Sequence, residues 1–347
     1  MMRMYLILNL CAFAVFCAPV VEGSDLFGLT GSVETIKRAS SRSPLVESPL
    51  FLGQSLDGIP PLNFSSQQSA TAIQMPSERP FFQEQQQQAW SWQLFPDGLI
   101  FPSFLAGVNE SRMGGVWNND KDLGWIWDIT LDGRAPLLRY GNKSAVNPVG
   151  WQLDLEGSVH LRLDLENDMD MDANDFRFGL PISYGTKKWQ VRFGYYHVSS
   201  HMGDERMLRL EAAGRPHNRI NYYREALIFG YAYTPRPDIR LYAEADYAID
   251  KGEYTKNWHF QFGAEYSPKF PNTRGFRGSP FAAVNVMLLE EHDFDGNINV
   301  QVGWQWRGSR NQAFRVGVQY FGGVSEQYEH IHSGREHKVG IGFWYDF

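Results

Sequence analysis

The feature that most constrains the fold is the alternation in the last eleven residues, from His337 to Phe347. Valine, isoleucine, phenylalanine and tyrosine occupy one parity of this stretch, whereas lysine, glycine, tryptophan and aspartate occupy the other. A period of two over that length predicts a β-strand with one apolar face and one face that is mostly polar or small. The two faces of this strand must therefore meet different surroundings.

The same alternation recurs from about Phe101 to the end of the chain. The clearest runs are residues 125–131, 151–165, 176–182, 189–195, 227–233, 239–247, 258–266, 298–307 and 314–320. Tryptophan, phenylalanine and tyrosine lie on the apolar row of nearly every run, which is rare in a soluble β-sandwich. The runs are not separated by helical patterns, which argues against a βαβ architecture.

These runs predict an all-β fold, a transmembrane antiparallel β-barrel of about twelve strands. The apolar rows would face lipid and the polar rows would face the lumen. The mean hydropathy of −0.38 agrees with this prediction because alternating strands average out their hydropathy. Both charge signs occur on the polar rows, which favours a small, filled lumen over a wide channel. The formal net charge of −7 argues against nucleic acid as a partner.

The chain begins with an apolar stretch that follows one early arginine, and residues 1–23 are predicted to be a secretory signal peptide. A single transmembrane anchor is the alternative, but the stretch is short for one. Both cysteines, Cys11 and Cys17, lie in this stretch, so the exported chain would contain neither disulfides nor thiolate metal sites. Residues 24–89 are rich in serine and glutamine and are predicted to be a disordered periplasmic segment. Residues 90–347 would form the barrel.

Connection lengths predict which end of the barrel faces which compartment. In an even-numbered barrel both chain ends are periplasmic, and the periplasmic turns are the shorter set. Residues 184–188, 234–238 and 307–311 are therefore expected to be periplasmic turns. Residues 202–220 and 322–335 are expected to be long extracellular loops.

Nine short motifs occur in a fixed order along the chain. They are Arg112–Trp117, Leu137–Gly141, Gly150–Asp154, Phe176–Gly179, Phe193–Glu205, Arg219–Tyr222, Phe260–Ser267, Phe276–Val284 and Phe343–Phe347. This series resembles an uncharacterised bacterial family, the domain of unknown function "twelve-oh-seven", over roughly Phe95 to Phe347. The resemblance implies an outer-membrane-type barrel and supplies no activity. The closing strand also resembles the last strand of outer-membrane barrels, so the barrel-assembly machinery, reading the strand that ends at Phe347, and outer-membrane lipid are the expected partners.

The densest group of reactive side chains lies at the end of the run that begins at Trp189. His197, Ser199 and His201 continue the apolar parity of that run, so they are predicted to face outward, near the extracellular rim. The local sequence His197-Val-Ser199 resembles outer-membrane phospholipase A and the lipid A deacylases. That resemblance implies a catalytic Ser199 with His197 as its general base. Glu225 has the matching parity on the next run and is the candidate to orient His197.

Two other interpretations of this group stay open. Histidine and serine are ordinary residues for the polar zone above an aromatic girdle, without any catalytic role. Alternatively, Asp204, Glu205 and His201 are candidate metal ligands, with calcium as the ion that the carboxylates favour. His197 and His201 would be about 13 Å apart on a strand, too far to share one ion.

The sequence therefore predicts an outer-membrane barrel of undefined envelope role, either a structural component or a narrow pore. The alternative function is a membrane-embedded lipid hydrolase that uses Ser199 and His197. No cofactor is expected apart from the calcium alternative, and the oligomeric state is left open.

Overall fold

The computed structural model describes residues 89–217, 219–269 and 277–347. The predicted signal peptide and all but the last residue of the predicted low-complexity segment lie outside the described residues. In the described part of the chain, no helix is long and apolar enough to cross a membrane.

The described residues form one antiparallel sheet of long strands. The strands are β1 (Ser91–Leu94), β2 (Met113–Asp120), β3 (Gly124–Leu131), β4 (Gly133–Gly141), β5 (Gly150–Asp164), β6 (Asp170–Gly185), β7 (Trp189–Met202), β8 (Tyr223–Arg236), β9 (Ile239–Lys251), β10 (Trp258–Tyr266), β11 (Ser279–Leu289), β12 (Asp295–Arg307), β13 (Ala313–Val324) and β14 (Arg335–Asp346). From β5 to β14, each strand pairs with the next along the chain.

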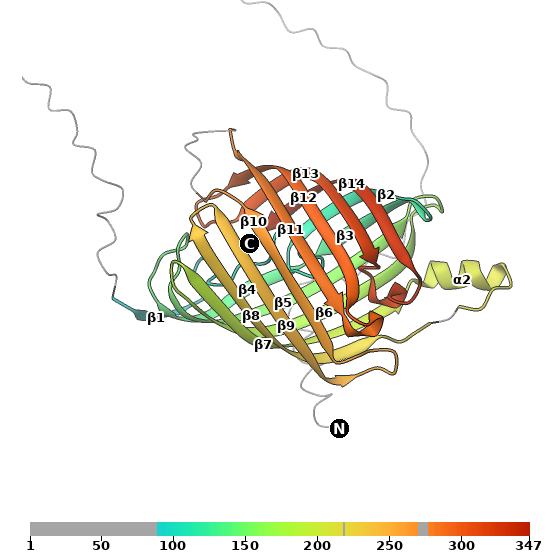
Figure 1. Cartoon of the computed structure of the whole chain (residues 1–347), viewed down its shortest axis with the longest axis horizontal. Coiled ribbons are helices and arrows are strands. Elements are labelled where there is room, and N and C mark those ends of the chain that lie inside the picture. The colour runs from blue at the N-terminus through green and yellow to red at the C-terminus, as the bar shows by residue number, and fades with distance from the viewer. Residues whose placement is uncertain (1–88, 218, 270–276) are drawn as a thin grey trace, which may run out of the picture. The chain divides into compact units, whose positions relative to one another are not determined.

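The first four strands share two positions in the ring. β3 and β4 are separated only by Asp132, and both pair with β5. β1 pairs with β4 and β2 pairs with β3, so β1 and β2 occupy the neighbouring position. β14 then pairs with β2 and closes the ring. Twelve strand positions therefore make a closed antiparallel barrel, which confirms the predicted fold (Figure 1).

The two faces of the strands differ as the alternation predicted. On β9, Leu241 and Tyr247 are 44% and 41% exposed on the outer surface, whereas Glu244 and Asp246 are each 8% exposed. Strand pairing satisfies the backbone hydrogen bonds all around the ring, which is what a lipid environment requires of a spanning strand. An apolar exterior around a charged interior is the arrangement of a transmembrane barrel.

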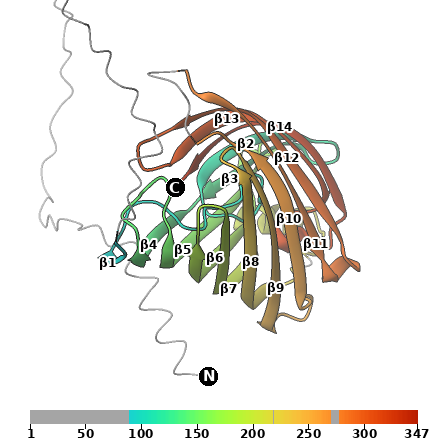
Figure 2. The same ribbon diagram turned by 60° about the vertical axis from the view of Figure 1, so that its left-hand side comes forward.

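The lumen contains a segment that the alternation did not predict. Residues 95–112, here called the lumen segment, connect β1 to β2 and run inside the ring of strands (Figure 2). Phe101 and Phe104 lie in this segment and are fully buried. Residues 101–112, where the alternation was read to begin, therefore lie inside the barrel, and the first strand with a partner on each side begins at Met113. Gly98, near the start of the segment, has a φ of +79° and lies against the backbone of Ala145, where a Cβ would not fit.

The two ends of the barrel carry different connections. One end holds Phe347 and the connections 142–149, 186–188 and 308–312, and is called the Phe347 end. The other end, called the α2 end, carries the helix α2 (Asp204–Ala212) and two short 3₁₀ turns, η1 (Glu290–His292) and η2 (Tyr328–His330). The expected short turns 184–188, 234–238 and 307–311 lie at the Phe347 end, and the expected long loops 202–220 and 322–335 lie at the α2 end. Which end faces the periplasm stays a prediction.

Candidate functional site

The residues predicted to be catalytic lie on the outer surface, on β7 and β8. The register pairs His197 directly with Glu225, and His197 Nδ1 lies 2.8 Å from Glu225 Oε1. The His197 side chain is 32% exposed and the Glu225 side chain 21%. The hydroxyl of Tyr195, two residues earlier on β7, also donates a hydrogen bond to Glu225, at Oε2. Both carboxylate oxygens are therefore occupied by β7 side chains.

Ser199 lies on the same outward row but is less closely engaged. It pairs with Phe176 of β6 and Tyr223 of β8. In the described part of the chain no hydrogen bond joins its hydroxyl to His197. Side chains two residues apart on one strand face start about 6.5–7 Å apart, so a Ser199–His197 contact requires both side chains to lean together. Catalytic contacts often tighten only when substrate is bound, and the roles of Ser199, His197 and Glu225 stay a prediction.

The three candidate metal ligands do not meet. Asp204 and Glu205 occupy the first turn of α2, where negative charge stabilises the helix N-terminus, and both are exposed. His201 is still on β7, and its Nδ1 accepts a 3.1 Å hydrogen bond from Arg219. Within residues 89–217, 219–269 and 277–347, no group of three histidine, cysteine or acidic side chains is placed to hold a metal ion. The calcium alternative stays an untested prediction.

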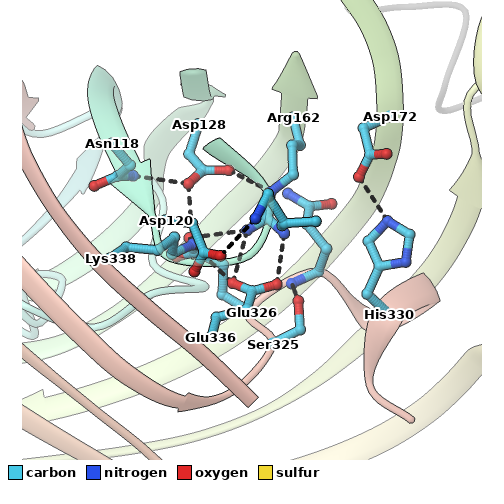
Figure 3. A network of polar contacts seen from close by, with 12 residues as sticks. Asn118, Asp120, Asp128, Arg162, Asp172, Ser325, Glu326, His330, Glu336 and Lys338 are labelled. Atoms are coloured by element: carbon cyan, nitrogen blue, oxygen red, sulfur yellow. Dashed lines mark hydrogen bonds and ion pairs between the residues drawn. The ribbon is translucent and has the colours of Figure 1, made fainter. Parts of the chain in front are cut away.

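The α2 end of the lumen holds a network of buried charges (Figure 3). Arg162 of β5 donates to Asp128 over 2.7 Å and to Glu336 over 2.6 Å. Lys338 of β14 lies 3.0 Å from Asp128 and 3.0 Å from Glu336, and it also pairs with Glu326. Two cations thus face three carboxylates in a region where Arg162 and Lys338 are fully buried.

One carboxylate of this network, that of Glu326, lies outside the strands and has a raised pKa. Burial raises the pKa of Glu326 to about 7, and the neighbouring carboxylates of Asp128 and Glu336 oppose its ionisation further, against the attraction of Lys338 and Arg162. Glu326 belongs to residues 325–334, here called the cap loop, which connects β13 to β14. The network therefore binds the cap loop to the barrel wall.

The cap loop is folded into the mouth of the barrel. Tyr328 and Ile331 are buried, and the ring of Tyr328 stacks on Tyr222 with centroids 4.5 Å apart. His330 Nε2 lies 2.7 Å from Asp172 Oδ2. Burial lowers the pKa of His330 to about 4, and the positive charges of Arg162 and Arg206 contribute to the shift. His330 is thus neutral at pH 7. The sequence predicted a long loop here and gave no sign that it folds into the mouth.

The lumen segment is held from several sides of the barrel. Six strand residues make the contacts: Arg177 with Asn109 O (2.9 Å), Arg192 with Glu110 Oε1 (3.0 Å), Arg240 with Pro102 O (2.9 Å), Glu265 with Leu105 N (2.6 Å), Asn299 with Ala106 O (2.9 Å) and Arg315 with Leu105 O (3.1 Å). β6 and β7 lie across the ring from β12 and β13. The segment therefore spans the cross-section of the lumen.

Little space remains beside the lumen segment. Its residue Val108 lines two cavities of about 30 and 40 Å³, each with room for a few water molecules. Phe104 stacks on Tyr242 of β9 with ring centroids 3.7 Å apart. The guanidinium groups of Arg192 and Arg240 lie 4.7 and 5.0 Å from the centre of the Phe101 ring. Around Val108, the described residues of the lumen segment and of the barrel wall therefore leave only small cavities.

Sequence reasoning missed Tyr195 and the lumen segment for different reasons. The signal for Tyr195 was present, because it shares the outward parity of His197 and lies diagonally across the strand pair from Glu225. The lumen segment was missed because a mixture of groups makes its contacts: main-chain atoms, the Glu110 carboxylate and two phenylalanines packed on cations. Alternation alone does not distinguish Phe101 in a strand from Phe101 in a lumen.

Comparisons with solved structures give distant likenesses to bacterial barrels. Outer membrane phospholipase A from Escherichia coli is 12% identical, with 67% of this chain and 89% of that chain covered and a TM-score of 0.45. The calcium-bound dimer of the Salmonella typhi outer membrane phospholipase is 12% identical, with 71% and 91% covered and a TM-score of 0.46. KdgM porin is 11% identical, with 68% and 99% covered and a TM-score of 0.38. Because the sequence identities are only 11–12% and the TM-scores lie below 0.5, these likenesses do not assign an activity to this chain.

No curated protein matches the sequence. The family model described as "Protein of unknown function (DUF1207)" matches residues 60–347. This match includes every described residue of the barrel and extends farther toward the N-terminus than the motifs alone indicated. The chain therefore belongs to the DUF1207 family.

Proposed function

We propose that this protein is a barrel of the bacterial outer membrane with a closed lumen, and that it serves the envelope as a structural component. The observation that carries the proposal is the lumen segment, which is anchored to strands on opposite sides of the ring. An open diffusion pore needs a continuous polar passage, whereas here the passage is occupied by Phe101, Phe104 and the main chain around them.

The membrane location and orientation belong to the same proposal. An apolar exterior with exposed aromatic side chains fits insertion in lipid, and a closed barrel of this type fits the outer membrane. The Phe347 end would face the periplasm and the α2 end the exterior. Outer-membrane lipid and the barrel-assembly machinery, reading the strand that ends at Phe347, are the proposed partners.

A liposome-swelling assay tests the closed-lumen proposal. Full-length protein reconstituted in liposomes should not let small sugars such as arabinose pass, because no passage is left beside the lumen segment. An open porin in parallel liposomes serves as the positive control. Sugar-dependent swelling by folded, heat-modifiable protein would overturn the proposal and favour the narrow pore.

A second candidate function is lipid hydrolysis at the outer surface, and the contact between His197 and Glu225 favours it. Glu225 would accept the Nδ1–H of His197 and leave Nε2 free to take the proton of the Ser199 hydroxyl. The serine oxygen would then attack an acyl ester carbonyl of a membrane lipid. The proton would pass to the leaving lipid alcohol, and water would release the fatty acid from the serine.

Paired variants on β7 test this second candidate. The Ser199→Ala and His197→Ala variants should lose hydrolysis of ester-linked lipid in mixed micelles. Ser200→Ala is the matched control, because Ser200 is the neighbouring serine but faces the lumen and bonds to Asp175. Equal hydrolysis by Ser199→Ala and by the unchanged protein would remove the hydrolase from consideration and leave the structural role untouched.

A further inference from the structure

A pocket opens at the Phe347 end of the barrel, beneath the lumen segment. Its wall carries three cationic side chains, Arg240 of β9, Lys269 of the β10–β11 connection and Arg307 at the end of β12. Pro102 and Leu105 of the lumen segment form its inner side. The cavity measures about 60 Å³, which is room for a few water-sized groups.

Two of the three cations lack an acidic partner. Arg307 donates to Pro268 O over 3.1 Å, to Asn311 O and Oδ1 over 3.0 and 3.1 Å and to Ser267 Oγ over 2.5 Å, and all four acceptors are neutral. Lys269 makes no hydrogen bond and no ion pair with any residue that the structure describes. It is nevertheless partly buried. A partly buried ammonium group that lines a cavity without an acceptor can take one from a bound ligand.

Three side-chain carboxylates of the pocket wall pair with groups other than Lys269 and Arg307. Glu265 accepts the Leu105 amide and lies 3.5 Å from Arg240. Asp346 is held by Arg315, with oxygen–nitrogen distances of 2.6 and 3.2 Å. The third carboxylate, Asp238, pairs with the exposed Arg236 at 3.2 Å. Glu265 and Asp346 act on Lys269 and Arg307 from a distance, but among the described residues no carboxylate lies within 4.0 Å of either cation.

The electrostatic state of Lys269 agrees with this geometry. Burial lowers the pKa of Lys269 to about 8, and the positive charges of Arg307 and Arg240 lower it further than the nearby Glu265 raises it. The positive potential of Arg307 and Arg240 that lowers the pKa of Lys269 also attracts anions to the pocket.

We propose that this pocket binds a small oxyanion between Lys269 and Arg307. The ligand chemistry is that of a carboxylate or a tetrahedral anion such as sulfate or phosphate, because both present the oxygen acceptors that ammonium and guanidinium groups bind. The pocket is distinct from the outward His197 cluster and from the charge network at the α2 end. Its location beside the lumen segment places the bound anion next to Arg240, which also holds Pro102.

Isothermal titration of the full chain in detergent tests the proposal, with sulfate and acetate as separate probes. At least one probe should bind, and Lys269→Met should weaken that binding by about tenfold or more, as expected when a charge-assisted hydrogen bond is lost. Lys188→Met is the matched control, since Lys188 is an exposed lysine at the same end of the barrel. Sulfate keeps its charge across the range, so its binding should weaken as the pH rises through about 8.

The two probes distinguish the source of the anion. Binding of acetate but not sulfate identifies a carboxylate ligand, and binding of sulfate but not acetate identifies a tetrahedral one. Absence of binding by both, or equal binding by Lys269→Met and the unchanged protein, overturns the proposal.

A second measurement keeps the test valid if the substitution disturbs the fold. After reductive methylation with a ¹³C label, the Lys269 signal of the otherwise unchanged protein should titrate near pH 8 and shift to higher pH when the anion is added. Titration near the ordinary lysine value of about 10.4, with no response to the anion, would contradict the proposal.

Discussion

The main-chain N–H of Leu105 donates a 2.6 Å hydrogen bond to Glu265, a residue 160 positions farther along the chain. The carbonyl of the same residue accepts a 3.1 Å bond from Arg315 on another strand. Leu105 is thus held from two sides by charged side chains inside the barrel, toward its Phe347 end. A segment without regular secondary structure is stable there because the strands supply the hydrogen bonds that a helix or sheet would otherwise provide.

Removal of the Glu265 carboxylate should loosen the lumen segment. In Glu265→Ala, the Leu105 amide loses its acceptor and the buried Arg240 loses its carboxylate at 3.5 Å. Hydrogen exchange of peptides from the lumen segment should accelerate by about tenfold or more, the size expected for a hydrogen bond to a charged group. Glu253→Ala, at an exposed glutamate of the α2 end, should leave the exchange unchanged. Unaltered protection in Glu265→Ala would contradict the anchoring role.

Arg162 should be among the most sensitive positions for stability. Its replacement by alanine leaves the carboxylates of Asp128, Glu326 and Glu336 with Lys338 as their nearest cation. Breaking such a buried network by removing one partner costs about 3–5 kcal/mol. Urea titration of refolding into lipid vesicles measures the change.

An exposed arginine provides the control for that measurement. Arg236→Ala removes a surface pair with Asp238 and should change the free energy of unfolding by less than about 1 kcal/mol. Similar losses for Arg162→Ala and Arg236→Ala would show that the buried network does not contribute as described.

Acid should open the cap loop through His330. The pKa of His330 is lowered in the folded protein to about 4, below its ordinary value of 6.5. Its contribution to stability is therefore present above pH 6.5 and is lost as the pH falls through 4. Hydrogen exchange in the cap loop, corrected for the intrinsic effect of pH, should accelerate over this range.

Substitution of the histidine separates this effect from the protonation of neighbouring carboxylates. His330→Gln keeps a donor toward Asp172 but does not titrate, so the acid-dependent acceleration should be smaller than in the unchanged protein. His217→Gln, at an exposed histidine of the same end, should behave like the unchanged protein. An identical acid response in all three proteins would exclude His330 as its source.

Glu225 distinguishes a catalytic cluster from ordinary polar side chains at the membrane interface. If His197 is a general base, Glu225→Ala should lower the rate of lipid ester hydrolysis by about a hundredfold or more, because the histidine loses the group that orients it. The barrel should keep its heat resistance in detergent. Hydrolysis unchanged by Glu225→Ala would assign the His197–Glu225 contact to the structure of the rim alone.

The residues explain how far the sequence could predict this fold. The period of two predicted a barrel of about twelve strands and the direction of side chains along the strands, because a strand with lipid on one face and a polar lumen on the other alternates. It also placed Glu225 opposite His197, because a short stretch of antiparallel pairing follows from parity. The period of two predicted neither the position of the lumen segment nor that of the cap loop. Their positions depend on contacts such as Leu105 with Glu265 and His330 with Asp172, which join residues far apart in the chain.

A barrel without the lumen segment tests most directly whether this segment closes the lumen. Leu94 pairs with Leu138 and Met113 pairs with Leu131, so a linker that spans about seven strand residues can replace residues 95–111. Single-channel recording in planar bilayers should show no lasting open state for the full chain, and stable conductance steps for a variant that carries a Gly/Ser linker there. Steady conductance of equal size in both proteins would contradict the claim.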